Sequence, residues 1–238
     1  MSSLLTSGAV GRRSRDALIH ARGRMIFAVP DRWRGRVAAA LPARLVPPEM
    51  RPGFFDDFFD EGDPFGFDRH PEEKLKFDRT LEVCGEGPLG RVLELGCAVG
   101  TFTEVLAPRA EDVLALDVSQ AAVDQVLERT RAFSNVRAVA MSIPREFPDG
   151  TFDLVVASDV LYYLPVVELQ RCVDRIEASL APGGAFVAVH YVPRMGSVLN
   201  GDEAHDVVVA HTGLEHVLSE RTEFGSGRPY RVDRFEKA

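Results

Sequence analysis

Cysteine and lysine are scarce in this chain of 238 residues, and long apolar runs are missing. The three cysteines, Cys84, Cys97 and Cys172, stand far apart and form no C-x-x-C pair. The sequence therefore predicts neither a disulfide framework nor a cysteine-bound metal, and it favours a reducing, cytoplasmic environment. Because no run of about eighteen apolar residues occurs, it also predicts no transmembrane helix. The 45% hydrophobic and 27% charged residues are typical of a soluble globular protein.

The formal net charge of −8 is unevenly distributed along the chain. Residues 1–52 carry ten arginines against three acids, a balance of +7, so the remainder carries −8 − 7 = −15. An acidic body argues against a nucleic acid as the main ligand, because phosphate binding needs a basic face. For 1–52 the sequence favours a flexible or partly helical extension with a short helix over 34–45. There are two alternatives. The segment could bind RNA, an acidic partner or the acidic body of the chain, or it could be a transit peptide.

After residue 90 the chain alternates short apolar runs with segments of helical length. Strands are predicted at 91–95, 113–117, 136–140, 153–158 and 185–190, and helices at 101–107, 119–130 and 166–180. This alternation predicts an α/β fold, a Rossmann-like doubly wound sheet covered by helices on both faces. A helix near 203–210 and two strand-like pieces, 214–221 and 229–236, follow. Before the sheet, helices are predicted at 54–59 and 72–84, the second with Leu75, Phe77, Leu81 and Cys84 facing inward.

The segment 91–118 contains a strand, a glycine turn, a helix and a second strand that ends on Asp117. Glycine is required where the backbone passes close to a ligand, because a Cβ would fill that space. A carboxylate at the end of the second strand can accept hydrogen bonds from both hydroxyls of a ribose. This order therefore predicts an adenosine-containing cofactor. The structural alternative for Asp117 is a helix N-cap, a role that Ser119 could also fill.

The glycine spacing distinguishes between cofactors. A dinucleotide fingerprint from Gly96 would need glycines at 98 and 101, where alanine and threonine stand. The segment ELGCAVG at 94–100 instead resembles motif I of the class I S-adenosylmethionine (SAM) dependent methyltransferases, with alanine at the middle glycine. A nicotinamide enzyme and a tight turn without ligand remain alternatives. The resemblance implies SAM as cofactor, with the candidate binding residues Gly96, Cys97, Gly100, Asp117 and Val118, and with Glu94 holding the turn and reaching the cofactor's amino group through water.

Polar residues also follow the later strands, at the edge of the sheet where ligands bind. Ser142 and Ile143 follow the third strand, where many methyltransferases place an acid for the adenine amino group. Asp159 follows the fourth strand, where it would face the sulfonium or the acceptor; a helix cap is its structural alternative. His190 ends the fifth strand, and a histidine there can take a proton at neutral pH unless it is structural. His205 could join them, but the absence of H-x-x-x-H or similar spacing predicts no metal site.

Five segments together resemble the nodulation protein S (NodS)-like methyltransferases: 63–68, 73–77, 161–164, 187–190 and 201–205. That family takes its name from an N-methyltransferase that acts on a chito-oligosaccharide amine. The match covers roughly 55–238 and has departures. Family members more often show tryptophan where Phe65 and Tyr191 stand, glutamate at Asp159 and aspartate at Ser142. The resemblance implies SAM, a small or sugar-like acceptor, a lid around 63–77 and a last strand inserted antiparallel.

The sequence thus predicts a basic extension over 1–52 and a methyltransferase domain over 53–238. Within that domain, a helical lid over 53–85 precedes a core over 86–238. The expected reaction is transfer of a methyl group to an amine of a small or sugar-like metabolite, as in secondary-metabolite biosynthesis. Asp159 or His190 would orient the amine or take its proton. A small-molecule O-methyltransferase, an RNA methyltransferase and a SAM-binding protein without catalysis are the alternatives.

Overall fold

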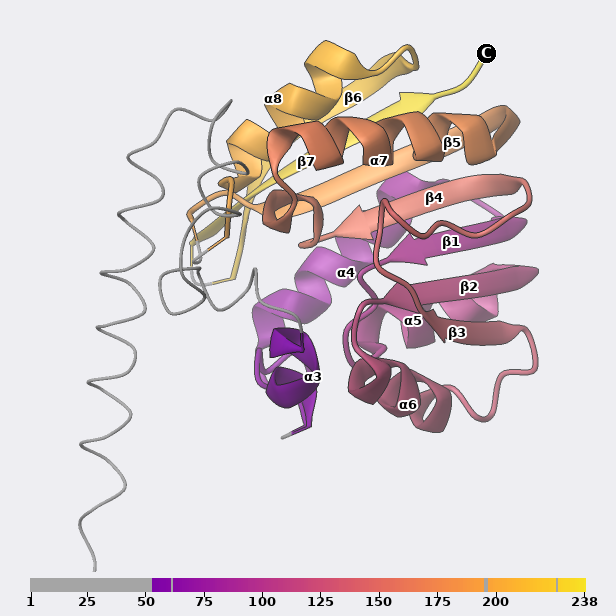
Figure 1. Cartoon of the computed structure of the whole chain (residues 1–238), viewed down its shortest axis with the longest axis vertical. Coiled ribbons are helices and arrows are strands. Elements are labelled where there is room, and N and C mark those ends of the chain that lie inside the picture. Colours follow the sequence, from indigo (N-terminus) through magenta and orange to yellow (C-terminus); the bar gives the residue numbers. More distant parts are fainter. Residues whose placement is uncertain (1–52, 61, 195–196, 226) are drawn as a thin grey trace, which may run out of the picture.

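A seven-stranded sheet forms the centre of the computed structural model, which describes residues 53–60, 62–194, 197–225 and 227–238 (Figure 1). The predicted extension 1–52, with its helix over 34–45, lies outside the described residues. The strands are β1 Arg91–Leu95, β2 Asp112–Asp117, β3 Val136–Ala140, β4 Phe152–Ser158, β5 Leu180–Tyr191, β6 Glu215–Phe224 and β7 Arg228–Glu236. The helices are α3 Phe54–Phe59, α4 Pro71–Cys84, α5 Thr101–Leu106, α6 Gln120–Arg129, α7 Val166–Ser179 and α8 Gly201–His211, with short 3-10 turns η3 Ala107–Arg109 and η4 Leu161–Tyr163.

The strand order is β3-β2-β1-β4-β5-β7-β6, with β1 to β5 parallel and β7 antiparallel between β5 and β6. Parallel neighbours need a crossover connection, and the alternation of strand and helix along the chain supplies it. The predicted doubly wound sheet with an antiparallel C-terminal strand is therefore confirmed. The predicted start of β5 at 185 is wrong, because the segment from Leu180 already pairs with β4 through a register shift.

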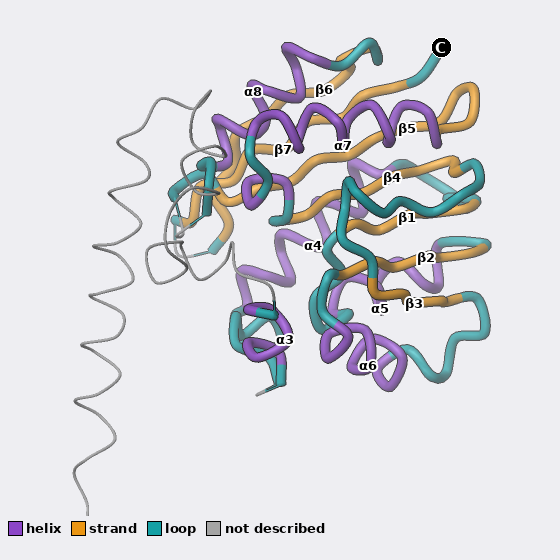
Figure 2. Tube along the Cα trace, in the orientation of Figure 1, coloured by secondary structure: helices purple, strands orange, loops and turns teal. Residues whose placement is uncertain are grey.

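Helices cover both faces of the sheet (Figure 2). Alternate residues of each strand point to opposite faces, so Leu93 packs in the cluster under α7 and α8, whereas Val92 packs in the cluster under α4 and α5. Burial on both faces explains why the strands read as continuous apolar runs. No helix in the described part of the chain is long and apolar enough to cross a membrane.

Helix α4 buries a face that is partly charged. Leu75, which was predicted to face inward, is 48% exposed, so that part of the prediction is wrong. Its neighbour Lys76 is 1% exposed and Glu73 is 4% exposed. Phe77 and Cys84 are buried as predicted. The inward face of α4 therefore keeps Phe77 and Cys84 but includes Lys76 and Glu73 in place of Leu75, which brings a lysine and a glutamate against the sheet.

Candidate functional site

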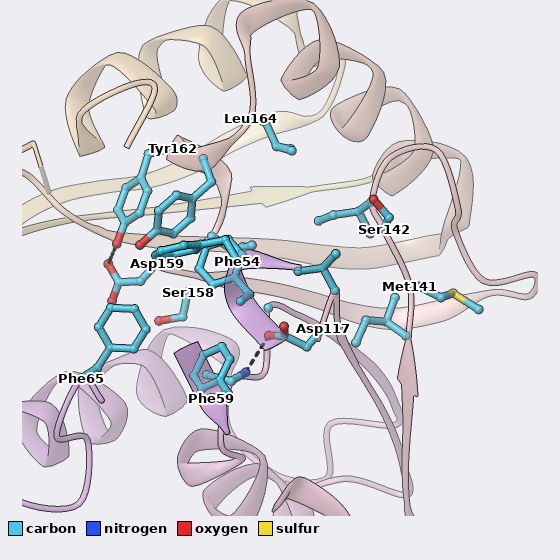
Figure 3. A pocket seen from close by; sticks show the side chains of 18 of the residues that line it. Phe54, Phe59, Phe65, Asp117, Met141, Ser142, Ser158, Asp159, Tyr162 and Leu164 are labelled. Atoms are coloured by element: carbon cyan, nitrogen blue, oxygen red, sulfur yellow. Dashed lines mark hydrogen bonds between the residues drawn. The ribbon is translucent and has the colours of Figure 1, made fainter. Parts of the chain in front are cut away.

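A pocket of about 720 Å³ opens at the carboxyl ends of the central strands (Figure 3). In open α/β sheets, ligands bind in the crevice at this edge. Its lining comes from the turn after β1, the ends of β2 to β5, β7 and the segment before β1. Helix α3 contributes three aromatic rings, those of Phe54, Phe55 and Phe59. The pocket is thus assembled from segments that are far apart in the sequence.

The turn after β1 requires glycine at its first position. Gly96 has φ 73°, and a Cβ there would lie 2.6 Å from Cβ of Val160. Gly96 and Ala98 both line the pocket, and Ala98 also has a positive φ of 48°. Gly100 stands before the first residue of α5 at φ 80°, where a Cβ would lie 3.0 Å from Cα of Val126. Gly100 is therefore needed for packing against α6.

Cys97 points away from the pocket that the described residues form. Its side chain is 4% exposed and packs in a small cluster with Ala115 and Val126. Its backbone N–H donates to the carbonyl of Leu116, at 2.9 Å. The structure therefore places Cys97 on the sheet side of the turn, while its neighbours on either side line the pocket.

Asp117 ends β2 beside this turn (Figure 3). Its Oδ2 accepts a hydrogen bond from the N–H of Ala98 and its Oδ1 accepts one from the N–H of Ser119, both at 3.0 Å. Burial raises the pKa of the Asp117 carboxyl, while the backbone N–H groups oppose that rise. Ser119, not Asp117, is the N-cap of α6, because its Oγ accepts from the N–H of Ala122. Asp117 therefore presents a fixed carboxylate to the pocket.

Glu94 lies behind the turn and outside the described lining of the pocket. Its side chain is 3% exposed, and its Oε2 accepts a hydrogen bond from the Thr103 hydroxyl at 2.6 Å. Burial raises the pKa of Glu94 to about 8. The contact joins β1 to α5, the two elements on either side of the turn.

The far side of the pocket from Asp159 is largely apolar. Met141, Ser142 and Ile143 line it after β3, and Val118, which is 51% exposed, lines it after β2. The backbone N–H of Ser142 donates to Oε2 of Glu146 at 2.8 Å. Together with Asp117, these residues line one part of the pocket.

Asp159 lies directly after β4, with φ 54°, and lines the pocket. Its Oδ1 accepts hydrogen bonds from the N–H of Tyr191 at 2.8 Å and from the Tyr162 hydroxyl at 3.1 Å (Figure 3). Its Oδ2 accepts one from Nζ of Lys76 at 2.8 Å. Asp159 is therefore an oriented carboxylate, and it also forms an ion pair with a cation that the sequence analysis did not select.

Lys76 joins two carboxylates beneath the pocket. Its Nζ lies 2.6 Å from Oε2 of Glu73 as well as 2.8 Å from Asp159, and over the rings of Phe77 and Tyr230 at 4.8 and 5.4 Å. Burial alone would lower the pKa of Lys76, but the carboxylates of Asp159 and Glu73 raise it above its usual value. The available signal in the sequence was that only three of the 28 basic residues are lysines, and two of them, Lys74 and Lys76, fall on the predicted helix over 72–84.

The structure does not bring His190 to the described lining of the pocket. The ring is 0% exposed; its Nε2 accepts a hydrogen bond from the N–H of Leu161 at 3.0 Å, and its Nδ1 lies 3.0 Å from Nε2 of His205. Nδ1 of His205 lies 2.7 Å from Oδ2 of Asp233. Burial first, and then His205 and Lys76, hold the pKa of His190 well below its ordinary value. Both ring nitrogens are thus occupied by the protein.

Comparison with known proteins identifies relatives of this chain. The sequence model of the family described as Nodulation protein S (NodS) matches residues 55–209. Nodulation protein S of Rhizobium tropici is 34% identical over 127 residues, which cover 52% of this chain and 53% of that protein. Nodulation protein S of Bradyrhizobium diazoefficiens is 35% identical over 122 residues, which cover 50% and 58%. The chain spans about half the length of the curated relatives it matches.

A solved structure extends the likeness to the fold. The N-methyltransferase NodS from Bradyrhizobium japonicum WM9, in complex with S-adenosyl-L-homocysteine, superimposes with a TM-score of 0.69 at 26% sequence identity. The match covers 77% of this chain and 98% of that one. The resemblance inferred from the sequence motifs is confirmed by the sequence matches and by this structure.

Proposed function

The chain belongs to the nodulation protein S (NodS) family, and on that premise we propose that it is a SAM-dependent methyltransferase that methylates an amine of a small, sugar-like molecule. One observation carries the proposal. A buried carboxylate, Asp117, is fixed by two backbone N–H groups beside a turn whose first position, Gly96, has no room for a Cβ. The NodS N-methyltransferase that shares this fold was solved with S-adenosyl-L-homocysteine.

The residues present suit the proposed cofactor. Asp117 would accept the two hydroxyls of the ribose, Gly96 and Ala98 would let the backbone lie close to the amino acid portion, and Ser142 and Ile143 would flank the adenine. Cys97, Gly100 and Glu94 would support the turn from behind. When bound, the cofactor supplies an electrophilic methyl group on a sulfonium centre.

Asp159 would orient the acceptor nitrogen. An amine attacks through its lone pair, so it must arrive uncharged, and a carboxylate that accepts one of its N–H groups aims the lone pair away from itself. Positioning of this kind accounts for about 7–11 kcal/mol of barrier lowering in well-oriented reactions. The nitrogen gains the methyl group and then releases one proton, to Asp159 or to water. We assign no proton transfer to His190, because both of its ring nitrogens are engaged.

The rings around Asp159 support a sugar-like acceptor. Phe65, Tyr162 and Tyr191 line the same part of the pocket, and aromatic faces pack well against the apolar faces of pyranose rings. We also propose a cytoplasmic location, because the three cysteines are buried free thiols, as suits a reducing compartment.

Calorimetry and a methyl-transfer assay test the proposal. The full chain is titrated with S-adenosylhomocysteine and, for contrast, with NAD. It is then assayed with SAM on D-glucosamine, deacetylated chitotetraose and N-acetylglucosamine, which has no free amine. We expect binding of S-adenosylhomocysteine alone and turnover only of the free amines. Tight NAD binding without S-adenosylhomocysteine binding would reject the cofactor, and binding without turnover of any acceptor would reject the enzyme.

A further inference from the structure

The Lys76 ammonium is buried in a site built for a cation. It is 1% exposed, its Nζ contacts both Glu73 and Asp159, and it lies over the rings of Phe67, Phe77 and Tyr230. Burying a lone ammonium is costly, and two carboxylates and three ring faces offset that cost. None of these contacts requires a ligand, so the arrangement is complete before any acceptor binds.

Three hydrogen bonds leave Asp159 one acceptor position. A carboxylate offers about four lone-pair sites. Among the described residues, the N–H of Tyr191 and the hydroxyl of Tyr162 use two on Oδ1, and Lys76 uses one on Oδ2. The side chain is 17% exposed and lines the pocket. One position on Oδ2 therefore remains for a group that enters the pocket.

At the acceptor position, the charge of Asp159 is already paired. Its Oδ2 contacts the Lys76 ammonium, which also contacts Glu73. Arg228 is shared in the same way, because its Nη1 lies 3.3 Å from Oε1 of Glu73 and its Nε lies 3.5 Å from Oε1 of Glu72. The three carboxylates and two cations sum to −1. An acceptor that arrives as an ammonium would therefore compete with Lys76 for Asp159, whereas an uncharged amine needs only one hydrogen-bond acceptor.

The following inference rests on the proposed function. We propose that Lys76 is a positioning residue of the acceptor site. It fixes Asp159, so that one lone pair of Oδ2 receives an N–H of an uncharged amine. The acceptor class that fits is an amine with a low pKa, such as the amino group next to the electron-withdrawing centre of an amino sugar. Amines of the α-amino type titrate near about 8, and alkylamines of the lysine type near about 10.4. Lys76 itself touches neither cofactor nor acceptor.

Paired lysine variants on one helix test this role. Lys76→Met removes the buried ammonium. The control, Lys74→Met, removes an exposed lysine of the same helix, whose Nζ lies 2.8 Å from Oδ2 of Asp78. We expect Lys76→Met to lower kcat with D-glucosamine by about tenfold or more. Affinity for S-adenosylhomocysteine should stay within about twofold of wild type, since Asp117 and the turn are untouched. Lys74→Met should match wild type in both assays.

The pH profile separates a positioning role from a merely structural one. Asp159 faces Lys76 and Glu73 from α4, Tyr162 from η4 and Tyr230 from β7, with Arg228 beyond Glu73. A nearby cation lowers a carboxyl pKa, so its removal raises that pKa. The acid limb of kcat should therefore move to higher pH in Lys76→Met. The double variant Glu73→Gln with Lys76→Met, which removes one of the two carboxylate charges, should recover part of that displacement.

The outcomes distinguish this inference from the proposed function. If Lys76→Met binds S-adenosylhomocysteine and keeps the wild-type kcat and acid limb, the positioning role is overturned while the methyltransferase assignment stands. If Lys76→Met fails to fold, the double variant decides in the same way. Wild type supplies a further measurement, because its kcat/KM for D-glucosamine should follow the uncharged fraction of the amine. A kcat/KM that is flat below the amine pKa overturns the selection of uncharged amines.

Discussion

Replacement of Asp117 by alanine removes the contact on which the cofactor assignment depends most. The carboxylate would hold two ribose hydroxyls, and each charge-assisted hydrogen bond contributes about 1.5–3 kcal/mol. The loss of both is about 3–6 kcal/mol, or roughly 10²–10⁴ in Kd at about 1.4 kcal/mol per factor of ten. Asparagine is not a conservative replacement here, because its NH₂ group would face one of the two N–H groups that Asp117 now satisfies.

Isothermal titration with S-adenosylhomocysteine measures the effect directly. Asp112→Ala is the matched control, because Asp112 begins the same strand at the opposite end of the sheet, where it pairs with Arg137 at 2.8 Å. We expect the control to bind like wild type and Asp117→Ala to lose at least about a hundredfold in affinity. If Asp117→Ala is folded and binds as tightly as wild type, the ribose is held elsewhere and the reasoning fails.

Three further variants test the turn, the buried Glu94 behind it and the buried His190. Gly96→Ala should lower cofactor affinity and the free energy of unfolding by about 1–3 kcal/mol, because the new Cβ would lie 2.6 Å from Val160; calorimetry and urea unfolding measure both. The raised pKa of Glu94, about 8, means that folding takes up a proton between pH 4.5 and 8, so the free energy of unfolding should fall as pH rises through that window. Glu94→Gln should flatten this dependence in urea titrations at pH 5 and 8, and an equal slope in both proteins would contradict the assignment. His190→Gln should destabilise the fold by about 1–3 kcal/mol yet keep the wild-type pH profile of kcat, and a lost acid limb would restore His190 as a proton acceptor.

The order of elements around the turn was predictable because its contacts are local. Gly96 and Asp117 are separated by one helix, and their strands pair directly, so a strand, a turn and a second strand suffice to bring them together. Local reasoning could also have assigned the residues of β5 to the two faces of the sheet, because side chains alternate along a strand. Val189 and Tyr191 share one face and His190 points to the other, where it meets His205 under α8. Its position at the edge of the sheet therefore did not imply a place in the pocket.

The ion cluster was not predictable, because its partners are distant and its burial contradicts the usual pattern. Lys76 and Asp159 are 83 residues apart, and no local motif connects them. Hydrophobic periodicity assigns the inward face of a helix to its apolar residues, so it selected Leu75 rather than Lys76. A buried ion pair supplies the compensation that this rule does not consider. Contacts between the segment before β1 and the ends of β4 and β7 can be found only in the folded chain.

The two pocket carboxylates lie in similar short sequences but have different surroundings. Ala-Leu-Asp-Val at 115–118 and Ala-Ser-Asp-Val at 157–160 each stand at the end of a parallel strand, at the same edge of the sheet. Asp117 is held by neutral backbone N–H groups, which leaves its charge available to hydroxyl donors. Asp159 is held by an ammonium from α4, which neutralises it and limits it to one further donor. In the proposed function, environment rather than local sequence would therefore assign one carboxylate to the nucleoside and the other to the amine.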